Sequence, residues 1–237
     1  MKIAIVGVGR AGSSFATALR QAGHDVLTFH HDRLDVISSV DLVLLCVPDD
    51  ELEAVSNELA RGSYVVAHVA GSRGLRGLNK HARTGFLHPL AVLSNTELGA
   101  ERLRGARFSV GGDELVVELV RSLDGTVLRL SDDQRALYHA TASVAANHMV
   151  ALLGHVEVLA EATGLSLEDF LPLVEQALSD VRALGASRAL TGPASRADMA
   201  TIDAHLDAIP ESERSTYVAM ANAAFELAEQ RRLTSHT

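Results

Sequence analysis

The sequence predicts an α/β protein in which an N-terminal doubly wound Rossmann domain, residues 1–130, is followed by an all-helical C-terminal domain, residues 131–237. Two observations support this prediction. Short apolar strands alternate with amphipathic helices over the first 130 residues, and every periodic segment after Ser131 is helical. The chain also opens with a strand, a glycine-rich turn and a helix, the order that is typical of dinucleotide-binding domains.

The opening strand, Ile3–Val6, leads directly into the glycine turn. Gly7 permits the tight turn, Gly9 lets the backbone approach a pyrophosphate, and Gly12 lets the next helix lie close to the sheet. That helix, Ser13–Gly23, would direct its free N–H groups and its dipole at the phosphates. A turn without a ligand is the weaker interpretation, because the flanking strand and helix match the motif. The expected cofactor contacts here are Gly7, Gly9, Arg10, Ala11 and Gly12.

The second strand, Asp25–His30, bears on which nicotinamide dinucleotide is bound. An NAD-binding domain places a carboxylate at the end of this strand, whereas histidine and arginine suit the 2′-phosphate of NADP. His30, His31 and Arg33 stand there, while Asp32, about twenty residues past the glycine turn, favours NAD. We therefore expect NADP bound by these three basic residues, with NAD as the alternative. A metal ion at this cluster is a weaker interpretation, and no metal is expected elsewhere.

Near-continuous apolar runs predict that buried parallel strands complete the first domain. The expected strands are Asp41–Val47, Tyr64–Val69, Gly85–Leu90, Phe108–Val110 and Thr126–Leu130, with helices at Leu52–Ala60 and Glu114–Leu123. Open α/β sheets bind ligands where their strands end. Val47 and Pro48, with Gly71 and Ser72 in the next small-residue turn, are therefore expected cofactor contacts, and Arg73 is expected to contact an anionic substrate.

Two capping boxes mark helix starts in the second domain. Ser131 with Gln134 opens a helix of about thirty residues, roughly 45 Å long, that ends at Gly164. Ser166 with Asp169 opens the next helix. The remaining features are an expected kink at Pro172, a helix end at Leu184, an irregular stretch at Thr191–Asp198, and helices at Met199–Ala208 and Ser212–Arg232.

The polar side chains of the long helix form one stripe among alanines. His139, Ser143 and Asn147 recur every four residues, so each advances by about 40° around an α-helix. His88, expected in a loop before Pro89, could act as a general acid because the unperturbed pKa of histidine lies near neutrality. These four polar residues are the candidate catalytic groups, and a solvent-facing stripe with a surface histidine is the alternative.

The composition points to a small-molecule partner. A net charge of −9 without a basic cluster argues against nucleic acid and anionic membranes. No apolar run approaches the ~18 residues that cross a bilayer, and Met1 leads directly into a strand, so we expect a cytoplasmic protein. Cys46, the only cysteine, is expected to be a buried, inert thiol. The long helix has apolar residues on more than one face, which predicts a homodimer through the helical domain.

Several motifs together resemble a known family. They are Gly7, Gly9 and Gly12; His68 with Gly71 and Ser72; His88, Pro89 and Leu90; Leu137, Tyr138, His139 and Ala140 through Asn147; and Leu190, Thr191, Gly192 and Pro193 with Arg196 and Asp198. Along nearly its full length the chain resembles proteins with a Rossmann-like domain and a C-terminal DUF2520 domain, within the 6-phosphogluconate-dehydrogenase-like oxidoreductases. Ala197 stands where that family usually has glycine.

The resemblance implies an NADP-dependent oxidoreductase that reduces a carbonyl or imine of a small, anionic metabolite held by Arg73, Arg196 and Asp198. Its wider relatives include ketopantoate reductase, pyrroline-5-carboxylate reductase and hydroxyisobutyrate dehydrogenase. Several of these place a catalytic lysine four residues before an asparagine, where this chain has Ser143 before Asn147. Only Lys2 and Lys80 are lysines among the 21 basic residues. The proton donor is then a histidine, or the protein is a catalytically silent sensor or scaffold that binds a dinucleotide.

Overall fold

A computed structural model describes residues 1–30 and 33–234, which form two compact units, Met1–Ala146 and Asn147–Thr237. Among the described residues only helices follow residue 131, but the units divide sixteen residues later than the domain boundary expected there. The physical reason is that the first turns of the long helix pack on the first unit. The guanidinium of Arg135 lies 4.1 Å from the centre of the Phe86 ring, and the His139 and His88 rings lie 5.7 Å apart.

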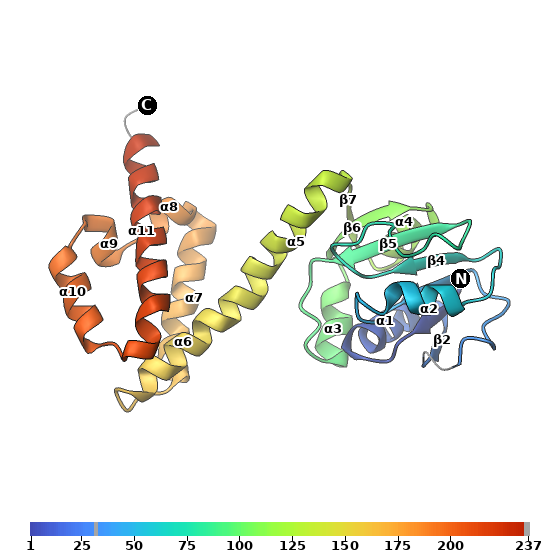
Figure 1. The fold of residues 1–237 in the computed structure, drawn as a ribbon, viewed down its shortest axis with the longest axis horizontal. Helices are drawn as coiled ribbons and strands as arrows, with labels where there is room; N and C mark the ends of the chain where they lie inside the picture. The colour runs from blue at the N-terminus through green and yellow to red at the C-terminus, as the bar shows by residue number, and fades with distance from the viewer. Residues whose placement is uncertain (31–32, 235–237) are drawn as a thin grey trace. The chain divides into compact units, whose positions relative to one another are not determined.

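The first unit contains a seven-stranded sheet in the order β2-β1-β3-β4-β5-β6-β7 (Figure 1). All neighbouring strands are parallel except β5 and β6, which are antiparallel. The predicted α/β class is confirmed, with the last two strands, β6 and β7, running opposite to the other five. The strands are β1 (Lys2–Val6), β2 (Asp25–Phe29), β3 (Leu42–Leu45), β4 (Val65–His68), β5 (Thr84–Pro89), β6 (Arg107–Gly112) and β7 (Thr126–Leu128).

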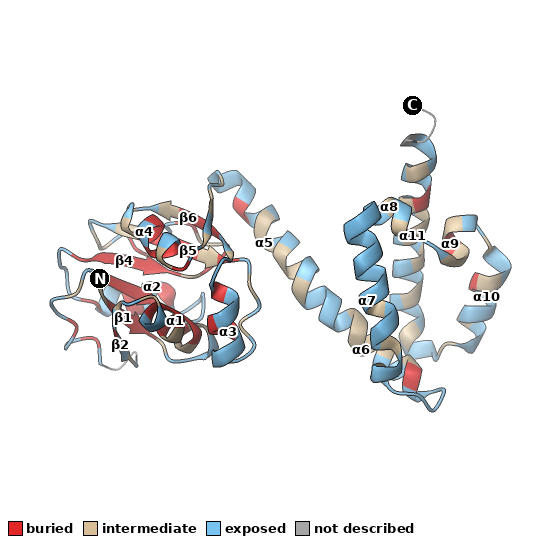
Figure 2. Ribbon diagram, turned by 180° about the vertical axis from the view of Figure 1, so that it is seen from behind, coloured by how far each residue is buried: buried red, intermediate tan, exposed pale blue. Residues whose placement is uncertain are grey.

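Helices cover both faces of this sheet, as the apolar runs of its central strands require. Because successive side chains point to opposite faces, Ile3 and Ile5 pack into one core cluster, and Ala4 and Val6 pack into the other. The first cluster includes residues of α1 (Arg10–Gln21), α3 (Thr96–Leu103) and α4 (Leu115–Ser122), and the second includes residues of α2 (Leu52–Glu58). The buried residues of Figure 2 accordingly concentrate in this unit.

Helix α3 was not predicted from the sequence. Asn95 caps it by accepting a hydrogen bond from the Leu98 backbone N–H at 2.9 Å. The helix packs on α1 at a small residue, since a Cβ at Gly99 would meet the Ser14 hydroxyl at 2.1 Å. An asparagine followed by a short helical run was the available signal, but eight residues are too few to show a clear apolar period.

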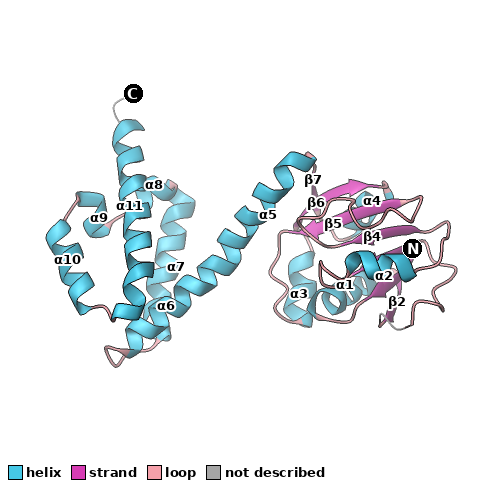
Figure 3. Cartoon of the chain, in the orientation of Figure 1, coloured by secondary structure: helices cyan, strands magenta, loops and turns pink. Residues whose placement is uncertain are grey.

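The second unit is entirely helical (Figure 3). Both predicted capping boxes are present, and the helix after Ser166 runs through Pro172 to Leu184. The stretch expected to be irregular, Thr191–Asp198, instead contains one short helix, Gly192–Arg196, which Ala197 and Asp198 separate from the next helix. The helices are α6 (Met149–Glu161), α7 (Leu167–Leu184), α8 (Ala186–Ala189), α9 (Gly192–Arg196), α10 (Met199–Ala208) and α11 (Arg214–Thr234), with a 3-10 turn at Glu211–Glu213.

The long helix predicted from Ser131 is built from several pieces. A 3-10 turn (Asp132–Gln134) and α5 (Arg135–Ser143) lead into a π-helix (Val144–His148), and α6 follows directly. This helix, Asp132–Glu161, is long and apolar enough to cross a membrane by length and composition, with a mean hydropathy of 1.3 and none of that window buried. No single apolar run in the sequence had indicated this, because polar residues interrupt the apolar ones.

Candidate functional site

The glycine turn lies at the edge of the sheet where the parallel strands β1, β3, β4 and β5 end. Gly7 has a positive φ of 96°, and a Cβ there would come 2.5 Å from the Cys46 carbonyl oxygen. A Cβ on Gly12 would come 1.8 Å from the carbonyl oxygen of Gly7. Both positions therefore require glycine for the fold itself. Cys46, beside them, is partly buried against the core, and desolvation raises the pKa of its thiol, which disfavours the reactive thiolate.

Gly9 differs from its two neighbours because nothing lies within 4 Å of a Cβ added there. It is the N-cap of α1, and no side chain caps this helix. The first-turn N–H groups of Arg10, Ala11 and Gly12 have no acceptor within the helix, and at a helix N-terminus the dipole favours an anion. The turn fits the pyrophosphate of a dinucleotide.

The next predicted cofactor contacts follow the ends of β2 and β3. His30 is exposed, and its carbonyl oxygen accepts a hydrogen bond from the Arg33 N–H at 3.2 Å. Arg33 is exposed as well. His31, which favours NADP, and Asp32, which favours NAD, both lie outside the described residues. Val47 and Pro48 follow β3 directly, at the same edge as the glycine turn.

The loop after β4 is organised by His68, a residue that is fully buried. Its Nδ1 accepts a hydrogen bond from the Ala70 N–H at 3.1 Å, and its Nε2 lies 2.6 Å from the Gly74 carbonyl oxygen, to which it donates. Burial lowers the pKa of His68 to about 4. The neutral ring is therefore fixed in one tautomer and holds both ends of the loop that contains Gly71 and Ser72.

His88 lies inside β5 and not in the loop predicted from Pro89. Its backbone is paired with Ser109 across the antiparallel β6, which explains why the strand continues to the proline. Its Nδ1 lies 3.1 Å from the Tyr138 hydroxyl of α5. A neutral ring whose Nδ1 accepts the Tyr138 hydroxyl proton carries its own proton on Nε2.

Two imidazoles converge on Gly71. A Cβ on this glycine would come 2.5 Å from Nδ1 of His139 and 2.8 Å from Nε2 of His88. The His139 Nδ1 is buried and has no hydrogen-bond partner among the described residues. Burial, and then repulsion from His139, lower the pKa of His88 to about 4. His88 is therefore neutral at pH 7 and can donate a hydrogen bond from Nε2, but it is not an imidazolium acid.

The structure brings two of the four predicted catalytic residues together, and it adds Tyr138, which the sequence analysis named only as part of a family motif. Ser143 ends α5, and Asn147 is the first residue of the second unit. The π-helix between them breaks the regular spacing on which the expected stripe was based. π-turns occur mostly within longer helices and often at functional sites. The roles of Ser143 and Asn147 stay predictions.

The three predicted substrate contacts fall in different places. Arg73 lies in the loop after β4, in the first unit, whereas Arg196 and Asp198 are in the second. Asp198 caps α10 by accepting hydrogen bonds from the backbone N–H of Thr201 at 3.2 Å and from its hydroxyl at 2.8 Å. These bonds lower the pKa of Asp198 and give it a structural role. Within residues 1–30 and 33–234, no group of three or more potential ligands could hold a metal ion.

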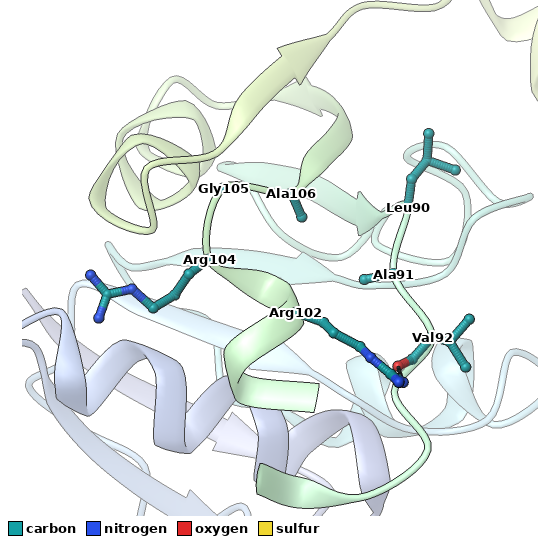
Figure 4. Close-up of a pocket in the computed structure, with 7 residues that line it drawn as sticks. All are labelled: Leu90, Ala91, Val92, Arg102, Arg104, Gly105 and Ala106. Carbon is teal, nitrogen blue, oxygen red and sulfur yellow. Dashed lines mark hydrogen bonds between the residues drawn. The ribbon is translucent and has the colours of Figure 1, made fainter. Parts of the chain in front are cut away.

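One cavity of about 510 Å³ lies away from these residues. It is lined by Leu90, Ala91, Val92, Arg102, Arg104, Gly105 and Ala106 (Figure 4). In Figure 4 Arg102 reaches toward Val92 while Arg104 extends in the opposite direction. Arg102 donates to the Val92 carbonyl oxygen at 2.8 Å, and Arg104 is paired with Asp124 at 3.5 Å. Since both arginines are already engaged and no predicted site residue lines the cavity, we do not place the site there.

Comparison with known proteins identifies one family match. Residues 110–224 match the domain of unknown function DUF2520, which confirms the resemblance drawn from the motifs. Among curated proteins, none matches the chain in sequence.

Solved structures match almost the whole fold. A Bacteroides fragilis protein provisionally assigned as an NADP oxidoreductase is 18% identical, with a TM-score of 0.81 over 95% of this chain and 98% of its own. A Thermotoga maritima protein is 20% identical, with a TM-score of 0.75 over 97% and 99%. A reductive aminase from Aspergillus terreus, in a complex that includes cyclohexanone and allyl amine, is 17% identical, with a TM-score of 0.70 over 95% and 93%.

Proposed function

We propose that this chain, which contains a DUF2520 domain behind a dinucleotide-binding fold, is an NADP-dependent oxidoreductase that reduces a carbonyl or imine of a small, anionic metabolite by hydride transfer. The proposal depends mainly on one observation, that the expected cofactor site and the candidate catalytic residues lie at the same edge of the sheet. The uncapped helix N-terminus at Gly9 and the histidine pair at Gly71 both follow strands that end there.

The structural relatives add weight to NADP as the cofactor. A second complex of the Aspergillus terreus reductive aminase contains NADPH, and the Bacteroides fragilis protein is assigned to NADP. In this chain His30 and Arg33, both exposed after β2, would hold the 2′-phosphate. The first-turn N–H groups of α1 would hold the pyrophosphate.

NADPH, when bound, supplies the hydride to the acceptor carbon. The acceptor oxygen or nitrogen then needs a proton. The relatives' catalytic lysine cannot donate it here, because Ser143 occupies that position in this chain. Neutral His88 would orient the acceptor by donating a hydrogen bond from Nε2, while Tyr138 holds its Nδ1. His139, whose Nδ1 is unpartnered, would supply the proton. Asn147 would hydrogen-bond the acceptor and Ser143 would position it.

A titration with NADPH tests the cofactor step. Gly9→Val adds a side chain in open space, so it should weaken NADPH binding at least tenfold and leave the melting temperature unchanged. Gly7→Val is the contrasting control, because its side chain would collide with the Cys46 carbonyl oxygen and should destabilise the fold. Wild-type NADPH affinity in Gly9→Val, or tighter binding of NADH than of NADPH at equal salt, would contradict the proposal.

A screen of 2-oxo acids and cyclic imines, followed by NADPH absorbance, tests the reaction. Turnover of any of these supports the oxidoreductase. Tight NADPH binding with no turnover across the screen would instead support a sensor or scaffold that has kept the fold and lost the chemistry.

We also infer that the protein acts as a cytoplasmic homodimer through its helical unit. Among the described residues the buried apolar side chains of this unit are only Ala160, Ala194, Ile202 and Ala228. Large apolar side chains are correspondingly exposed, Val150 at 68% and Leu173 at 63%. A second copy would cover them. Membrane insertion would have to bury the polar groups of His139, Asn147 and His148 on the same helix, at a substantial cost.

A further inference from the structure

A second cavity, about 440 Å³ in volume, lies in the first unit between the loop after β4 and the start of α5. It is lined by Arg73, Leu75, Arg76, Asn79, Asp132 and Arg135. Three guanidinium groups thus face one carboxylate, in a chain whose net charge is −9. Such a concentration of positive charge in one hollow of an acidic protein attracts anions.

Arg135 is the buried member of this group, with only 7% of its side chain exposed. Its Nε donates to Asp132 at 2.7 Å and its Nη2 donates to the Leu130 carbonyl oxygen at 3.2 Å. Its Nη1 is buried and has no partner among the residues that the structure describes. The Asp132 carboxylate that pairs with it is 92% exposed. Water therefore screens this carboxylate and weakens its attraction to the buried guanidinium of Arg135.

The other two arginines leave donors free as well. Arg76 uses Nε and Nη2 to donate to the carbonyl oxygens of Arg73 and Ser72, at 3.1 and 3.0 Å, which fixes the loop. For the side chain of Arg73, no hydrogen bond or ion pair is present within residues 1–30 and 33–234. A planar guanidinium group with unused N–H groups can donate paired hydrogen bonds to the oxygens of a phosphate or a carboxylate.

We propose that this cavity, which we call the arginine pocket, is a binding site for an oxyanion, the phosphate or carboxylate group of a small molecule. The volume fits, since small-molecule sites occupy roughly 300–1,000 Å³. The oxyanion would accept hydrogen bonds from the free donors of Arg73 and Arg76 and would add to the negative charge that the exposed Asp132 carboxylate offers to buried Arg135. Asn79 offers an amide donor at the rim.

The arginine pocket adjoins the histidine pair through one loop. Gly71, at the start of the loop, faces His88 and His139, while a Cβ on Gly74 would come 3.1 Å from Nε of Arg135. Arg135 and His139 are four residues apart on α5, about 6 Å along a helix. An anion in the pocket would therefore order the same loop that carries Gly71.

Calorimetric titration of the full chain with inorganic phosphate at low ionic strength tests the site. We expect saturable binding that Arg73→Gln and Arg135→Gln each weaken at least tenfold, as loss of a charge-assisted hydrogen bond predicts. Arg129→Gln is the matched control, because it removes the same charge from an exposed residue outside the pocket, and it should change the phosphate Kd by less than about twofold. Arg73→Gln keeps the test valid if Arg135→Gln does not fold.

The glycine turn is a competing phosphate site, so Gly9→Val is titrated in parallel. Phosphate binding that persists in Gly9→Val and is lost in Arg73→Gln assigns it to the arginine pocket. Binding lost only in Gly9→Val, equal binding in all variants, or no binding by the wild type would overturn the proposal. The result is independent of the proposed function, because NADPH affinity should be unchanged in Arg73→Gln.

Turnover experiments distinguish the two sources of the oxyanion. Competition between phosphate and an anionic substrate would show that the pocket holds the anionic group of that substrate. An unchanged KM in the presence of saturating phosphate would show that it holds a separate ligand. Both outcomes support an oxyanion site.

Discussion

Gly71 lies so close to His139 that a single methyl group on its Cα would come within 2.5 Å of the ring Nδ1. His88 approaches the same point from the other side, at 2.8 Å. Glycine is needed here for space and not for its backbone conformation, since its φ is not positive. Two histidines from distant parts of the sequence are thereby brought to the loop that follows β4.

Gly71→Ala should therefore strain the histidine pair. Both rings must shift to admit the methyl group, and overpacking of this kind lowers the free energy of unfolding by about 1–3 kcal/mol. Denaturant unfolding measures the change, with Gly9→Ala as the control, because open space surrounds a Cβ at Gly9. Equal stability of Gly71→Ala and the wild type would mean that the rings have room that the structure does not show.

The stability of the protein should fall in acid because of His68. Its pKa is about 4 in the folded protein and near 6.5 when unfolded, so on acidification the unfolded chain takes up the proton first. The contribution of His68 is complete above about pH 6.5 and is lost progressively down to pH 4, by about 3 kcal/mol. Denaturant unfolding from pH 7 to 4 tests this, and His68→Gln should show a correspondingly smaller pH dependence.

Ala197→Gly should stabilise the second unit. Ala197 has a φ of 55° in the left-handed region, at the position where the DUF2520 family usually has glycine. Relief of this strain, less the greater flexibility of glycine, should raise the free energy of unfolding by about 0.5–1 kcal/mol. Ala223→Gly, an exposed position inside α11, is the control and should lower it by about 1 kcal/mol. A loss of stability in both variants would refute the strain.

Once a substrate is found, the site residues should separate by their effects on kcat. His139→Ala and Asn147→Ala should each lower kcat on the order of a hundredfold, as loss of one aligned group does, with NADPH affinity nearly constant. Tyr138→Phe releases Nδ1 of His88 and should lower kcat by about tenfold. His148→Ala, next to Asn147 but off the predicted stripe, should keep the wild-type rate. If all the site variants kept the wild-type rate, these residues would have structural roles and no role in catalysis.

Light scattering should give twice the chain mass of 25.2 kDa at micromolar concentration. Val150→Asp and Leu173→Asp place charges on the exposed apolar helices of the second unit and should shift the protein to the monomer mass. Leu98→Asp, at a similarly exposed leucine of α3 in the first unit, should leave the mass unchanged. A monomer at all concentrations for the wild type would refute the dimer.

Local patterns were enough to predict most of the fold. The glycine turn, both capping boxes and the buried strands depend on short-range chemistry that the sequence displays. The reversed direction of β6 and β7 was not predictable, because an apolar strand such as Phe108–Val110 has the same character whichever way it runs. The π-helix was missed for a related reason, since Val144–His148 has no composition that distinguishes it from an α-helix.

The candidate site was only partly predictable. His88 and His139 were named separately, and their meeting at Gly71 depends on the packing of α5 against β5, which no local pattern encodes. The role of His68 could have been suspected from a lone histidine within an apolar strand before a small-residue turn. The arginine pocket combines residues more than sixty positions apart, Arg73 and Arg135, and only Arg73 among them was expected to meet an anion.

The placement of His88 within β5 has a consequence for how substrates are selected. The antiparallel strand β6 holds its backbone, and Tyr138 lies at its ring Nδ1, so much of the conformational entropy of this histidine is already lost when the chain folds. A ligand gains a hydrogen bond from it without further ordering cost. The acceptor group must therefore adjust to the histidine. In the reaction proposed above, substrates that differ at their other end would meet Arg73, whose side chain has no hydrogen bond or ion pair within the described residues.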